Sequence, residues 1–162
     1  MNRTLTTARP SAEARTTRFP VRAARLLLTG PTPATRWPVT LLALAGAALL
    51  FWSGVIHLML WSDGYRDISV IGPLFLVQAI ASVTLAVTLV VFRRLALLAA
   101  GAVAAVAAAA GLLLSASVGL FGYSESLAVP YAELSLAVEF TAAAVLALAS
   151  AIVLVTALRA RR

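Results

Sequence analysis

Four polar side chains that could take part in acid–base or hydrogen-bonding chemistry lie near one end of the long apolar runs of this 162-residue sequence. They are His57, Arg66, Gln78 and Glu139. Glu139 lies inside an apolar run, where a charged group costs roughly 2.5–3.5 kcal/mol or more and usually faces the interior of a helix bundle. His57, the only histidine, and Arg66 are the two cations that could pair with it. The spacing therefore predicts one polar cluster formed by these four residues.

A second group of polar residues is expected at the mouth of this cluster: Asp63, Tyr65, Asp67 and Glu133. Each member also has a simpler explanation. Asp63 before Gly64 is typical of a turn, and Tyr65 belongs with an aromatic belt at the membrane surface. An Arg66–Asp67 ion pair in an exposed loop contributes little to stability. Glu133 is expected in the first turn of a helix, where the helix dipole favours an acidic side chain. His57 could simply pack as a polar group against Ser53.

The composition identifies the class of protein. Hydrophobic residues make up 62% of the chain and charged residues 12%, whereas soluble domains average roughly 45–50% and 25%. This balance indicates an integral membrane protein. The absence of cysteine excludes thiolate and iron–sulfur chemistry, and a single histidine excludes multi-histidine metal sites within one chain. We expect no metal and no cofactor.

Four apolar runs are long enough to cross a hydrocarbon core, which takes roughly 20 residues of helix. They span residues 39–60, 72–92, 95–120 and 131–158. Backbone groups in lipid must be satisfied within the segment, so each run is expected to be a helix. Their short connections predict an all-α fold, a transmembrane up-down-up-down four-helix bundle. Residues 1–36 form a basic tail that is expected to be disordered, and the alternative is a short interfacial helix over residues 19–28. Residues 37–158 form the membrane domain, and residues 159–162 form a second basic tail.

The arginines predict the orientation. Twelve of the thirteen basic residues lie before the first run, between the second and third, or after the fourth. The positive-inside rule therefore places both termini in the cytoplasm and the cluster at the outer face of the cell membrane. Because these arginines flank membrane spans, the net charge of +7 does not point to nucleic acid. We expect the protein to lie in the lipid bilayer and to bind a partner protein or a lipid.

Small residues predict where the helices meet. Gly111, Ser115 and Gly119 form a stripe on the third run. Polar and small residues also share one face of the first run and one face of the fourth: Gly46, Leu50, Ser53, Gly54, His57 and Trp61, and Ser135, Glu139, Ala143, Leu146 and Ser150. We expect these faces to point inward.

The segment from His57 to Gln78, with its G-Y-R and I-G-P-L-F-L cores, resembles a group of uncharacterised four-helix integral membrane proteins of actinobacteria. The resemblance covers about a fifth of the chain, the first loop and the helix ends beside it. It implies the architecture and the location, but no catalytic residue.

Three functions remain open. The favoured one is a non-enzymatic bundle whose outer polar cluster binds a partner protein or a lipid, because no catalytic motif is found. The alternatives are a small proton-linked transporter subunit that uses Glu139 and His57, and a membrane enzyme that binds a lipid or quinone headgroup through Tyr65 and Arg66. A docking bundle needs only a shallow pocket, whereas the alternatives need a cavity that reaches Glu139.

Overall fold

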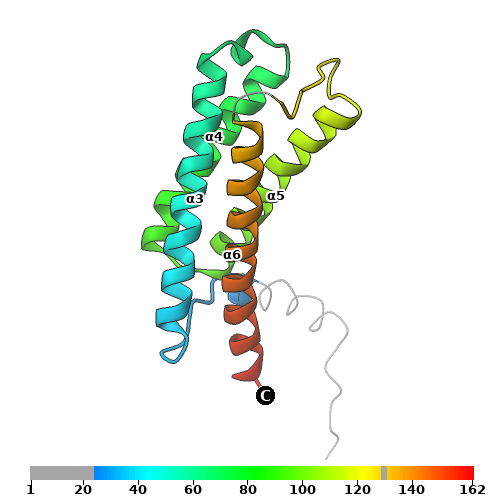
Figure 1. The fold of residues 1–162 in the computed structure, drawn as a ribbon. Coiled ribbons are helices and arrows are strands. Elements are labelled where there is room, and N and C mark those ends of the chain that lie inside the picture. The colour runs from blue at the N-terminus through cyan, green and yellow to red at the C-terminus, as the bar shows by residue number, and fades with distance from the viewer. Residues whose placement is uncertain (1–23, 129–130) are drawn as a thin grey trace, which may run out of the picture.

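The computed structural model describes residues 24–128 and 131–162, and within these ranges the protein is helical, without strands (Figure 1). The long helices are α3 (Arg36–Ser62), α4 (Ile71–Val91), α5 (Leu95–Ser117) and α6 (Ala132–Arg159). One turn of 3₁₀-helix, η1 (Tyr65–Asp67), connects α3 to α4. The four helices are long and apolar enough to cross a membrane. The predicted all-α fold is confirmed, and it is compatible with an integral membrane protein.

Most helix ends differ by one to three residues from the predicted ones, and at two of them a residue with a left-handed backbone explains the difference. Helix α5 ends at Ser117 instead of continuing to residue 120, because Gly119 adopts a left-handed backbone with φ of 78°. Helix α6 begins at Ala132 because Tyr131 is also left-handed, with φ of 69°. In both cases an apolar composition continues past the helix, so hydropathy alone did not reveal the boundary.

Helices α3 and α6 form the centre of the bundle. Helix α3 packs extensively on α4 and on α6, and α5 packs on α6, whereas the contact between α4 and α5 is much smaller. Leu50, Leu89, Leu98 and Leu146 are fully buried in the shared core. A Cβ on Gly46 would overlap the Leu146 side chain, so this glycine allows α3 and α6 to approach closely.

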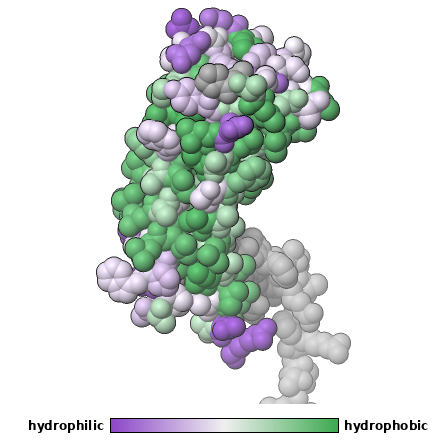
Figure 2. All heavy atoms as spheres, in the orientation of Figure 1, coloured by the Kyte–Doolittle hydropathy of each residue, from purple (hydrophilic) through white to green (hydrophobic). Residues whose placement is uncertain are grey.

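The outer surface of the bundle is apolar. Large hydrophobic residues such as Trp37, Val77 and Val103 are mostly exposed. Figure 2 shows hydrophobic residues over most of the visible side of the helices, with hydrophilic residues gathered mainly toward the two ends. Such a surface suits a hydrocarbon environment. One end of the bundle carries η1 and the loop between α5 and α6, and we call it the η1 end.

The opposite end, which we call the arginine end, carries Arg36, the α4–α5 turn with Arg93 and Arg94, and the end of α6 (Figure 1). Residues 24–27 form one helical turn, and Leu26 packs against the core. The Leu95 N–H donates to the carbonyl oxygen of Thr29 at 2.9 Å. The last part of the predicted tail is therefore attached to the bundle, while its residues 1–23, with the first half of the alternative interfacial helix, lie outside the described residues.

Candidate functional site

His57 on α3 and Glu139 on α6 face each other inside the bundle. Nε2 of His57 lies 3.8 Å from Oε1 of Glu139, and both residues are buried. Nδ1 of His57 lies 2.9 Å from the carbonyl oxygen of Ser53, one turn earlier on the same helix. A carbonyl can only accept, so Nδ1 carries a hydrogen and donates it. This bond fixes the imidazole so that Nε2 is the nitrogen directed at Glu139.

The two oxygens of the Glu139 carboxyl have different surroundings. Oε1 accepts hydrogen bonds from the Ser135 hydroxyl at 3.1 Å and from the Ser53 hydroxyl at 3.5 Å, in addition to its contact with His57. Oε2 is buried and has no hydrogen-bond partner within the described part of the chain. A buried oxygen without a hydrogen-bond partner lowers the free energy of unfolding. It therefore either destabilises the fold or marks a place where a ligand atom donates the missing hydrogen bond.

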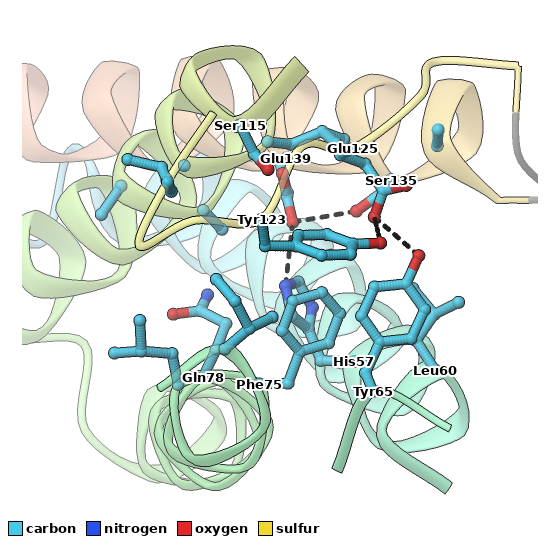
Figure 3. A pocket seen from close by; sticks show the side chains of 18 of the residues that line it. His57, Leu60, Tyr65, Phe75, Gln78, Ser115, Tyr123, Glu125, Ser135 and Glu139 are labelled. Atoms are coloured by element: carbon cyan, nitrogen blue, oxygen red, sulfur yellow. Dashed lines mark hydrogen bonds and ion pairs between the residues drawn. The ribbon is translucent and has the colours of Figure 1, made fainter. Parts of the chain in front are cut away.

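The side of the cluster nearest the η1 end is closed by a second carboxyl, Glu125, in the loop between α5 and α6. Its Oε2 accepts hydrogen bonds from the Tyr65 hydroxyl at 2.6 Å and from the Tyr123 hydroxyl at 3.2 Å (Figure 3). Its Oε1 accepts the backbone N–H of Ser126 at 2.9 Å. Burial raises the pKa of the Tyr65 phenol well above its ordinary value, and the bond to Glu125 raises it further. Burial raises the pKa of Tyr123 in the same way.

The loop that carries Glu125 is anchored on the last turn of α5. The carbonyl oxygen of Ser115 accepts the backbone N–H of Glu125 at 3.3 Å and the Ser124 hydroxyl at 3.4 Å. Between these points the chain makes a tight turn in which Leu120 and Tyr123 exchange two backbone hydrogen bonds. The local turn therefore determines where the Tyr123 ring and the Glu125 carboxyl lie.

Tyr65 is positioned by the close approach of η1 to α4. A Cβ on Gly72 would lie 2.8 Å from the carbonyl oxygen of Tyr65 and 2.6 Å from that of Arg66, so only glycine fits. The Tyr65 ring stacks on Phe75 with centroids 4.8 Å apart, and His57 lies on Phe75 at 5.2 Å. Tyr123 meets Tyr65 edge to face at 6.0 Å. These rings form an aromatic wall of the cavity that both carboxyls also line.

These groups surround a cavity of about 280 Å³ between the helices. Its polar lining includes His57, Gln78, Ser115, Ser135 and Glu139, with Tyr65, Tyr123 and Glu125 toward the η1 end (Figure 3). The rest is apolar, from α4 and α5: Ile71, Leu74, Phe75, Val77, Ala107, Ala108, Gly111 and Leu112 are among the lining residues. The cavity lies where α4 and α5 make little contact with each other.

Two members of the predicted small-residue stripe, Gly111 and Ser115, line this cavity instead of closing an interface between helices. A Cβ on Gly111 would meet no atom within 4 Å, although the sequence predicted close packing at the stripe of Gly111, Ser115 and Gly119. Ser115 is buried, yet its hydroxyl oxygen has no partner among the residues described. Two of the residues with a buried and unpartnered polar atom, Ser115 and Glu139, therefore line the same cavity.

The structure brings together three of the four residues of the predicted cluster, and it leaves Arg66 out. His57, Gln78 and Glu139 line the cavity. The amide nitrogen of Gln78 donates to Ser82 at 3.2 Å and to the Ala104 carbonyl at 3.4 Å, which joins α4 to α5. The Arg66 side chain is 56% exposed, does not line the cavity, and lies 3.8 Å from Asp67. The reason is η1, in which neighbouring residues point in different directions, so Tyr65 points inward and Arg66 outward.

The residues expected at the mouth divide in the same way. Tyr65 lines the cavity, whereas Asp63, Asp67 and Glu133 are exposed and do not. Their simpler explanations as turn, loop and helix-start residues match these positions. Sequence reasoning missed Glu125, Ser115 and Tyr123 as cavity residues. Glu125 and Tyr123 lie in a loop without periodicity, so no pattern in the sequence indicated that they face a cavity.

Within residues 24–128 and 131–162, no group of three or more His, Cys, Asp or Glu side chains could hold a metal ion. The polar groups of the cavity can instead donate, accept and exchange protons with an organic molecule. No family model, curated protein or solved structure matches this sequence. The function of the cavity must therefore be inferred from its geometry and chemistry.

Proposed function

We propose that this is a multi-pass membrane protein that binds one small amphipathic, lipid-like molecule in the cavity between its helices. The observation that carries the proposal is the buried, unpartnered Oε2 of Glu139 in the wall of a mainly apolar cavity of about 280 Å³. A ligand with an apolar body and a polar head would fill the space and supply the missing partner.

The proposed topology is an up-down-up-down bundle in the cell membrane. The arginine end faces the cytoplasm with both termini, and the η1 end faces outward. The support is the distribution of basic residues, since Arg66 is the only arginine at the η1 end within residues 24–128 and 131–162. The cavity would then lie in the outer half of the bilayer, within reach of molecules dissolved in the lipid.

The size of the cavity limits the ligand. Small-molecule sites commonly measure about 300–1,000 Å³, and this cavity of about 280 Å³ lies just below that range. It has room for one ring system or part of one chain and is too small for a whole two-chain phospholipid. Binding within the bundle is therefore supported better than docking of a protein on a shallow outer face.

A second candidate function, proton-linked transport, is supported by the contact of His57 with Glu139. Because Nδ1 donates to Ser53, a proton between the two residues is shared only by Nε2 and Oε1. Such a pair facing a cavity could couple ligand binding to protonation. This candidate predicts a pH-dependent flux in proteoliposomes that is lost in Glu139→Gln and kept in Glu133→Gln.

Native mass spectrometry tests the proposed binding. The protein is released from its native membrane, and the wild type is compared with Gly111→Phe, in which the new ring enters the free space beside Gly111. Val103→Phe is the matched control, because this residue lies on the same helix and is 68% exposed on the outside. We expect one small bound molecule on the wild type and on Val103→Phe, and none on Gly111→Phe.

Two results would contradict the proposal. One is a wild-type protein that carries no small molecule after release and takes up none from a lipid extract. The other is a bound molecule that Gly111→Phe retains as well as the wild type, which would place the binding elsewhere.

A further inference from the structure

We infer that the ligand of the cavity is a lipophilic amine, bound as an ammonium against the Glu139 carboxylate. This inference rests on the proposed function and narrows it to a chemical class. It follows from the charges that face the cavity, from the hydrogen-bonding capacity left free in its wall, and from the aromatic rings that line it beside its two carboxyls.

The ionisable lining of the cavity is mainly acidic. Glu139 from α6 and Glu125 from the α5–α6 loop line it, and His57 from α3 is the only basic residue among the described lining residues. Even with His57 protonated, two carboxylates would leave one negative charge without a counterion. The Arg66 guanidinium lies outside the cavity. A phosphate or carboxylate head would therefore be buried beside like charges, which is costly, whereas a cationic head would be stabilised.

The free hydrogen-bonding capacity also matches an ammonium. Oε1 of Glu139 is occupied by Ser135, Ser53 and His57, whereas Oε2 is free. The Ser115 hydroxyl oxygen is free as well and belongs to the same lining. An ammonium group has three N–H donors and no acceptor. It can therefore donate to both oxygens, and a charge-assisted bond to a carboxylate is among the strong ones.

The rings beside these oxygens favour the same ligand class. Phe75, Tyr65 and Tyr123 lie together beside Glu139 and Glu125 (Figure 3). An aromatic face attracts a cation within about 6 Å, most strongly where water is excluded. The Tyr65 and Tyr123 hydroxyls already donate to Glu125, so their ring surfaces are what they can offer to a ligand.

The apolar part of the cavity determines which chemical groups the ligand can carry besides its amine. Leu74 and Val77 from α4 and Ala108 and Leu112 from α5 line it. None of these side chains can satisfy a hydrogen-bonding group. The proposed ligand is therefore a small amine with a single apolar body, and not a sugar, an amino acid or a phospholipid.

Three probes of nearly the same shape test the charge preference: phenethylamine, phenethyl alcohol and hydrocinnamate. They carry a cationic, a neutral and an anionic head on the same apolar body. Their affinity for the full-length protein in lipid nanodiscs is measured by isothermal titration calorimetry, with empty nanodiscs subtracted. We expect the amine to bind at least about tenfold more tightly than the alcohol, and the anion most weakly.

Variants connect this preference to the site. Glu139→Gln keeps the shape of the side chain and is expected to reduce the amine-to-alcohol affinity ratio to about one. Glu133→Gln on the same helix is the control, because Glu133 is exposed and away from the cavity. Ser115→Ala removes the second acceptor and is expected to weaken amine binding several-fold, which gives an independent test should Glu139→Gln fail to fold.

The inference is overturned if the alcohol or hydrocinnamate binds the wild type as tightly as the amine, or if the amine preference survives in Glu139→Gln. It is also overturned if none of the probes binds. In each of these cases a natural molecule that is retained by the wild type and lost in Gly111→Phe would still support the proposed function, so the two failures can be told apart.

Discussion

Nε2 of His57 lies 3.8 Å from Oε1 of Glu139, and the Ser53 backbone carbonyl holds the opposite nitrogen of the ring. The two residues come from α3 and α6, the central helices of the bundle. Their contact therefore links the packing of the bundle to the chemistry of the cavity.

This contact predicts energetic coupling between the two side chains. His57→Gln and Glu139→Gln should each change the free energy of unfolding, and the double variant should differ from the sum of the two changes by about 0.5–3 kcal/mol. Unfolding in mixed detergent micelles measures this. The pair of His57→Gln with Glu133→Gln is the control and should be additive; additive behaviour of the 57/139 pair would contradict the contact.

Two helix glycines should respond in opposite ways to alanine. Gly72→Ala places a Cβ against the Tyr65 and Arg66 carbonyl oxygens and should destabilise the protein by about 1–3 kcal/mol. Gly111→Ala adds a methyl group to free space in a helix and should be neutral or stabilising by up to about 1 kcal/mol. Thermal unfolding in detergent compares them. Equal destabilisation by both variants would mean that α5 packs more closely at Gly111 than the structure shows.

The approach of α3 to α6 depends on Gly46 and Leu146. Gly46→Ala should destabilise the bundle because its Cβ would overlap the Leu146 side chain. Leu146→Ala alone should cost about 2–5 kcal/mol through the cavity it leaves. In the double variant the new methyl group faces that empty space, so the combined loss should be smaller than the sum. If unfolding experiments show that the double variant loses as much stability as the two single variants together, the strain of Gly46→Ala does not come from its overlap with the Leu146 side chain.

The Tyr65–Glu125 bond predicts a response to alkaline pH. Because the pKa of Tyr65 is raised above its ordinary value of 10.0, the folded state favours the neutral phenol. The stability from this group is complete below pH 10 and is lost as the pH rises past that value. Ultraviolet titration should show tyrosines that ionise late, and Tyr65→Phe should reduce this late component to the part that belongs to Tyr123. A wild-type titration in which every tyrosine ionises near pH 10 would contradict the bond.

The proposed orientation is testable because the chain has no native cysteine. Ser69→Cys places a single thiol at the η1 end, and Ala160→Cys places one at the arginine end. In intact cells, a membrane-impermeant maleimide should label the thiol at position 69 and leave the one at position 160 until the membrane is opened. The reverse pattern would mean that the arginine end faces outward.

The sequence was sufficient to predict the four long helices and some of the residues of the candidate site. Runs of about 20 apolar residues can satisfy their backbone in lipid only as helices, so the four helices followed from hydropathy. Glu139 stood out because a carboxyl inside such a run needs a polar environment. His57 and Gln78 stood out as scarce polar groups at helix ends, and both line the cavity with Glu139.

Only the tertiary structure decided which polar groups meet and that a cavity lies between them. In η1 the side chain of Tyr65 points inward and that of its neighbour Arg66 outward, a difference that spacing in the sequence does not encode. Glu125 reaches the cavity because the Ser115 carbonyl anchors its loop, an interaction without sequence periodicity. The stripe around Gly111 permits close packing but does not require it. Helices α4 and α5 make little contact with each other, and the space beside Gly111 remains open. The direction of a helix depends on all the helices that it packs against, and not only on the small residues of one of its faces.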